Sequence, residues 1–165
     1  MWHVILIAAH ATAGLIALVT GVVAMRHGRL FDVYLGSLAG MTLFLTLAIG
    51  ARWDAIDTAG RVLFTAFAGL AGLMVWRATL ARRVRPTDAS RPSTSYLDHV
   101  GFTLVALFDG FCVIAVLDAG APVWVAVGTG VVIAIAGHFA LHWAKSVLAQ
   151  PENAAVVGFT RADSR

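Results

Sequence analysis

Charged side chains are scarce in this sequence. Asp, Glu, Lys and Arg together make up 13% of the 165 residues, whereas 59% of the residues are hydrophobic and the mean hydropathy is +0.83. A soluble domain of this length needs far more polar surface, because water must solvate the outside of its core. The composition therefore predicts a protein whose solvent is mostly the lipid bilayer.

Motifs of soluble enzymes are also missing. The sequence has no glycine-rich loop for a phosphate, no HExxH pair and no nucleophile elbow. Its single cysteine, Cys112, cannot form a disulfide within the chain. The basic residues behind the formal net charge of +3 stand at the ends of apolar runs and form no basic face with interleaved aromatics. We therefore expect no nucleic-acid partner, and any chemistry must lie inside the membrane part.

Five long apolar runs fill most of the chain. At about 1.5 Å per helical residue, each run is long enough for a hydrocarbon core of roughly 30 Å. We therefore predict an all-α fold, a polytopic bundle of five transmembrane helices over residues 1–150, followed by a cytoplasmic tail over 151–165. The segment 86–95, rich in Pro, Ser and Thr, is predicted to be a flexible loop. The five runs are residues 2–25, 30–51, 62–81, 100–117 and 123–144.

Small residues at four-residue spacing predict faces where helices approach closely, because a small side chain lets two backbones come together. The pattern occurs in four of the five runs. Its members are Ala9, Ala13, Ala17 and Gly21 in the first run, Gly36 and Gly40 in the second, Ala68 and Gly72 in the third, and Gly130 and Ala134 in the fifth.

Lysine and arginine are divided unevenly between the two sides of the predicted bundle. Nine lie on the side of the C-terminus, and only Arg52 and Arg61 lie on the other side. By the positive-inside rule, this split places the N-terminus outside and the C-terminus in the cytoplasm of a bacterial-type plasma (inner) membrane. The nine are Arg26, Arg29, Arg82, Arg83, Arg85, Arg91, Lys145, Arg161 and Arg165.

Two histidines stand out in the last run. His138 and His142 are four residues apart, so a helix places them on one face, at a depth where ionisable groups usually face a protein interior, a ligand or a polar path. Two imidazoles can hold one metal ion, but no third ligand is evident and no metal site is predicted. His142 is a candidate axial ligand of haem b, paired with His99 or His27 near the inner boundary. Alternatively, the histidines are hydrogen-bonded structural residues or line a polar path.

Asp109 is the one carboxylate predicted near the middle of the membrane. The short turn 118–122 makes the last two runs antiparallel neighbours, which places Asp109 within about one turn of His138 in depth. Either the two form a buried pair that passes a proton, or Asp109 is protonated and hydrogen-bonded to a neighbouring helix. Arg77 reaches the inner headgroups or pairs with Asp109. His10, in the outer half, is a polar core residue or a ligand.

Three stretches of the first 50 residues resemble a known family. They are His10-Ala-Thr-Ala-Gly14, the segment Gly21-Val-Val-Ala-Met-Arg26-His27-Gly28, and Val33-Tyr34-Leu35-Gly36 followed by Met41. They are similar to a family of uncharacterised bacterial multi-spanning membrane proteins, a domain of unknown function with a histidine in span one. Such families tend to have a histidine at the start of span two, where this chain has Asp32. The resemblance implies a membrane bundle and supplies no substrate.

These observations leave two classes of function open. The first is a redox membrane protein associated with haem or quinone, with haem b as the candidate cofactor. The second is a non-enzymatic protein: a small transporter with a proton path through Asp109 and His138, or an accessory subunit of a larger membrane complex. The expected partners are the lipid bilayer and either such a complex or further copies of the chain. The sequence does not decide whether the protein is an enzyme.

Overall fold

The structure, a computed structural model, describes residues 2–86 and 91–148. This part of the chain is all-helical, as the sequence predicts, and its five long helices are each long and apolar enough to cross a membrane. The helices are α1 (Trp2–His27), α2 (Phe31–Gly50), α3 (Thr58–Arg83), α4 (Thr94–Asp118) and α5 (Val123–Leu148), with a short 3-10 helix η1 (Trp53–Ala55) between α2 and α3.

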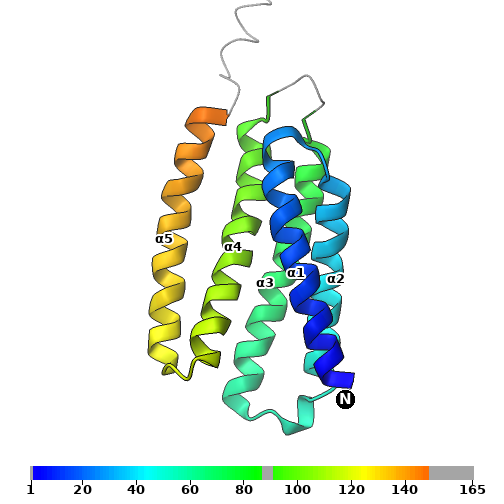
Figure 1. The fold of residues 1–165 in the computed structure, drawn as a ribbon, viewed down its shortest axis with the longest axis vertical. Coiled ribbons are helices and arrows are strands. Elements are labelled where there is room, and N and C mark those ends of the chain that lie inside the picture. Colours follow the sequence, from blue (N-terminus) through cyan, green and yellow to red (C-terminus); the bar gives the residue numbers. More distant parts are fainter. Residues whose placement is uncertain (1, 87–90, 149–165) are drawn as a thin grey trace, which may run out of the picture.

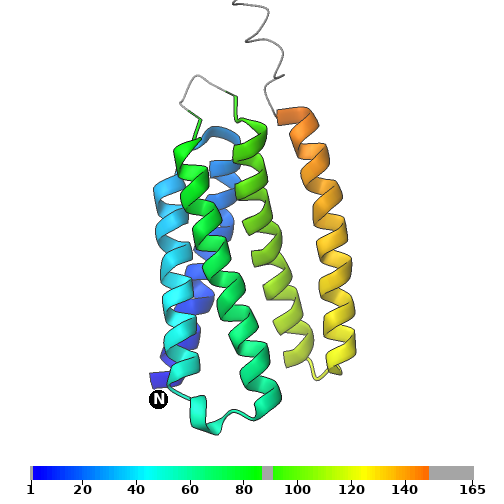
Figure 2. The ribbon, with the colours of Figure 1, turned by 180° about the vertical axis from the view of Figure 1, so that it is seen from behind.

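The helices run up and down as an antiparallel bundle (Figure 1). Helices α1 to α4 pack around one core, and α5 lies beside α4 at the edge of the bundle, which the view from behind also shows (Figure 2). Only 6% of the residues in the most apolar part of α5 are buried, against 28% in α4. Most of α5 is therefore available to lipid or to another protein.

Two helices begin earlier than the hydropathy predicts. α4 starts at Thr94 and α3 at Thr58, each with a polar first turn outside the apolar run. The Ser93 side chain accepts a hydrogen bond from Tyr96 N, and the Asp57 side chain accepts one from Gly60 N, so each caps its helix. The predicted loop 86–95 therefore extends two residues too far, because residues 94 and 95 already belong to α4. The predicted tail 151–165 lies outside the described residues.

The core lies between α1, α2, α3 and α4, and its polar contacts are formed where α1, α2 and α4 meet. Gly21 of α1 packs against the Tyr34 ring of α2 and against Leu104 of α4. The Tyr34 hydroxyl forms a buried hydrogen bond with the Thr103 hydroxyl, and the Tyr96 hydroxyl donates to Ala24 O at 2.8 Å. These bonds satisfy the polar ends of two buried aromatic residues and tie α4 to both α1 and α2.

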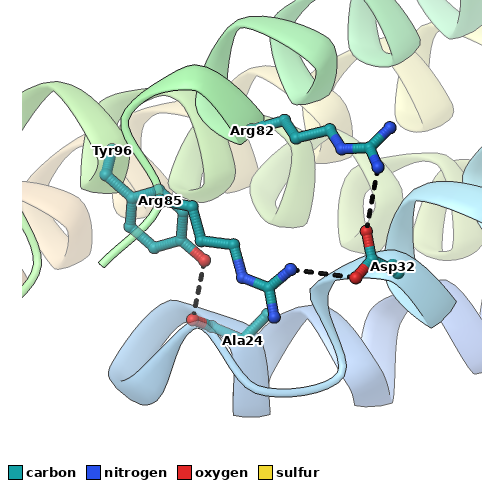
Figure 3. A network of polar contacts seen from close by, with 5 residues as sticks. All are labelled: Ala24, Asp32, Arg82, Arg85 and Tyr96. Atoms are coloured by element: carbon teal, nitrogen blue, oxygen red, sulfur yellow. Dashed lines mark hydrogen bonds and ion pairs between the residues drawn. The ribbon is translucent and has the colours of Figure 1, made fainter. Parts of the chain in front are cut away.

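The end of the bundle that carries the α1–α2 turn and the C-termini of α3 and α5 is called the basic end below. There Asp32 of α2 accepts from Arg85 at 2.9 Å and pairs with Arg82 at 3.6 Å (Figure 3). The Asp32 side chain is 63% exposed, so each pair contributes at most about 1 kcal/mol. Gly28, at φ +65°, turns the chain from α1 towards α2 beside Pro86. Asp32 therefore fastens this turn to the C-terminus of α3.

Candidate functional site

The most unusual polar cluster lies between α3 and α4 near the basic end. Arg77, on α3, places its guanidinium carbon 4.6 Å from the centre of the Phe102 ring on α4. Its Nε donates to His99 Nδ1 at 3.4 Å, one turn before Phe102 on the same helix. All three side chains are half-buried. We call Arg77, His99 and Phe102 the arginine cluster.

Local structure holds the arginine cluster in place. Since the Ser93 cap starts α4 at Thr94, His99 falls in the second turn of the helix and Phe102 one turn later. Lys145 of α5 donates a hydrogen bond at 2.7 Å to the carboxylate of Asp98, the residue before His99. This bond holds α5 against α4. α4 is thus anchored on two sides at the depth of this cluster.

The Arg77 guanidinium forms no ion pair with a carboxylate in the part of the chain that the structure describes. The predicted alternative of a pair with Asp109 is therefore not formed there. A ring face attracts a cation by about 0.5–2 kcal/mol, but it does not accept the in-plane N–H groups of the guanidinium. The cluster therefore presents unused hydrogen-bond donors on a positive charge, which suit a ligand with acceptor oxygens.

The candidate haem ligands lie on three different helices, α1, α4 and α5. His99 faces Arg77 of α3, His142 is exposed on α5, and His27 is exposed at the end of α1. An axial pair needs two imidazoles at one depth on opposing helices. The contacts of Lys145 with Asp98 and of Leu141 with Gly101 place His142 and His99 at similar depth, and this pairing stays a prediction. Residues 2–86 and 91–148 contain no group of three His, Cys, Asp or Glu side chains placed to hold a metal ion.

The pair of Asp109 with His138, one of the two alternatives that the sequence left open, is not formed among the described residues. The Asp109 carboxyl lies against Gly130 of α5, where a Cβ built on that glycine would be 3.4 Å from Oδ1. Gly130 precedes His138 by about 12 Å of helix, and His138 is exposed. Asp109 Oδ1 is buried and has no hydrogen-bond partner among the described residues. The carboxyl thus faces the seam between α4 and α5, and the predicted partner points elsewhere.

His10 joins two helices. Its Nδ1 lies 3.0 Å from the carbonyl oxygen of Met41 on α2, and since a carbonyl oxygen only accepts, Nδ1 donates. An apolar groove of about 390 Å³ runs between α1, α4 and α5. It offers no polar group that could orient a ligand. It is lined by Leu18, Leu104, Val105, Phe108, Ile133, Ala136, Gly137 and Ala140.

Reasoning from the sequence missed Phe102 as a site residue and the contact of Arg77 with His99. The three-residue spacing of His99 and Phe102, which puts them on one helix face, is visible in the sequence and was the available signal.

Comparisons of the chain with models of protein families, with curated proteins and with solved structures gave no match. The functional argument therefore depends on the geometry of this helix bundle alone.

Proposed function

We propose that this membrane protein binds the head group of a membrane-dissolved quinone at the arginine cluster and is a quinone-associated redox protein. The observation that carries the proposal is Arg77, a half-buried cation with an aromatic ring and an imidazole beside it and no carboxylate partner among the described residues. A cation on a transmembrane helix is costly and usually marks a functional site.

A quinone matches these groups one by one. Its carbonyl oxygens accept hydrogen bonds from the guanidinium, its flat ring can stack beside Phe102, and its apolar tail remains in the lipid. Reduction to the quinol takes up two electrons and two protons, and the His99 imidazole is a suitable group to exchange a proton with the head group. The electrons would come from a redox partner, in keeping with a role in a larger membrane complex.

Binding of a short-chain ubiquinone to the full chain in lipid nanodiscs tests this proposal. Arg77→Gln is expected to weaken binding at least about tenfold, because a hydrogen bond to a charged group contributes about 1.5–3 kcal/mol. Arg83→Gln, an exposed arginine on the same helix, serves as the control and should leave the affinity unchanged. Equal affinity for the wild type and Arg77→Gln would reject the proposal. A Soret band that His142→Ala removes and His3→Ala retains would favour haem instead.

One observation favours the transporter alternative. Asp109 Oδ1 is a buried oxygen with no partner in the described part of the chain, and a membrane-embedded carboxyl of this kind is typical of proton-coupled sites. Because His138 does not pair with it, such a path would have to leave Asp109 along the seam of α4 and α5.

The proposed orientation places the basic end in the cytoplasm. A reporter enzyme that is active only in the cytoplasm should therefore be active when fused after Arg165, and a reporter that requires export should be silent there. Fusions after Ala119, in the turn between α4 and α5, should give the opposite pattern. Activity of the exported reporter after Arg165 would reverse the proposed orientation.

A further inference from the structure

The histidine pair of α5 faces away from the other described helices. α5 meets α4 through Gly137, which lies against Val105, and through Leu141, which lies against Gly101. His138 and His142 each follow one of these contact residues, so a step of about 100° per residue turns them away from α4. Both histidines are exposed. The apolar groove opens on the opposite flank of α5, which Ala136 and Ala140 line.

This flank lies at membrane depth. Trp124 and Trp143 are about 28 Å apart along α5, which matches the two interfaces of a hydrocarbon core of roughly 30 Å. His138 is then about 8 Å inside the interface that Trp143 marks. Polar side chains at such depth almost always face protein or a water-filled cavity, because lipid offers no hydrogen bond. A protein surface is therefore expected to cover this flank.

The spacing of the two imidazoles indicates which kind of ligand they can bind. Histidines at i and i+4 on one helix face can bind the same transition-metal ion, and imidazole suits Zn²⁺, Cu²⁺ and Ni²⁺. A closed zinc site takes four ligands, and the described residues of one chain offer no third one. A second copy related by a two-fold axis along the membrane normal would supply the same two histidines at the same depth.

We propose that His138 and His142 from two copies of this chain bind one transition-metal ion, with zinc as the best match, where two α5 helices meet. The rest of the flank fits this partner. Along this flank of α5, exposed residues recur at the spacing of three and four residues that is typical of contacts between two helices. His142 lies one residue from the interfacial Trp143, which gives the ion a route from water. The exposed residues along this flank are Trp124, Val127, Val131, Ile135, His138 and His142.

The proposal is independent of the quinone site, since that site uses α3 and α4. Full-length protein without a polyhistidine tag is loaded with ZnCl₂ in detergent, dialysed, and examined for zinc content and molar mass. We expect a dimer with about one zinc ion per two chains, the stoichiometry of a four-histidine site. His138→Ala and His142→Ala should each weaken zinc binding at least about tenfold, since even loss of an outer-shell partner has that effect.

His27→Ala, an exposed histidine at the end of α1, is the control and should bind zinc like the wild type. Circular dichroism verifies that each variant keeps its helices. Zinc held at one ion per monomer, unchanged zinc affinity in both α5 variants, or no binding of zinc, copper or nickel would each overturn the proposal. Loss of the dimer in both α5 variants, together with loss of zinc, would establish it.

Discussion

Replacing Gly21 with valine is expected to lower the free energy of unfolding by about 2–3 kcal/mol, because the core around it has no spare volume. A Cβ at this position would lie 2.7 Å from Leu104 Cδ2 and 2.9 Å from Tyr34 Cδ2. The Tyr34 ring is fully buried, and its hydroxyl is bonded to Thr103, so the ring cannot move aside without losing that bond. Helix α1 would have to move away from α2 and α4.

Unfolding by SDS in mixed micelles, followed by tryptophan fluorescence, measures this effect. The matched control is Gly72→Val on α3, also a mid-helix glycine, where an added Cβ would meet no atom of the described residues within 4 Å. The control should change the free energy of unfolding by no more than about 0.5 kcal/mol. If both variants lose the same stability, the cost would come from the helix backbone and not from the packing of Gly21.

Replacing Asp109 with leucine is expected to raise the free energy of unfolding by about 1–3 kcal/mol, the usual cost of a buried polar atom without a hydrogen bond. Asp109 Oδ1 is such an atom in the described part of the chain. Leucine has a similar shape, and its apolar side chain would lie beside Val113 and Gly130. Asp109→Asn keeps a polar group at the site and should be close to neutral. Pairing with His138 predicts the opposite order, with leucine worse than asparagine.

The same SDS titration separates these outcomes. Asp118→Leu, an exposed aspartate at the end of α4, is the control and should remain within about 0.5 kcal/mol of the wild type. A loss of stability in Asp109→Leu alone would mean that the carboxyl has a partner in the membrane. If the protein conducts protons, Asp109→Leu should be stable and inactive, which distinguishes a functional carboxyl from a structural one.

The sequence by itself determined the fold class, because long apolar runs are a local property that length and hydropathy measure directly. It also predicted contact faces that were right only in part. Ala17 and Gly21 are buried on α1, as predicted. Gly36 and Gly72 are exposed, and a Cβ added at either one would meet no atom of the described residues within 4 Å. Four-residue spacing selects one face of a helix, and it carries no information on whether a helix or lipid lies opposite that face.

Sequence position also converts to depth, since each helical residue adds about 1.5 Å. This estimate placed Asp109 within about one turn of His138, whereas in the structure Asp109 lies beside Gly130, about 12 Å of helix from His138. Only the tertiary structure decided the rotation of each helix about its axis. Packing at Gly137 and Leu141 turns α5 so that its histidines face outward, and the contact of α3 with α4 brings Arg77 to His99 and Phe102. Rotation follows from the fit of side chains on two helices, a property that neither helix carries alone.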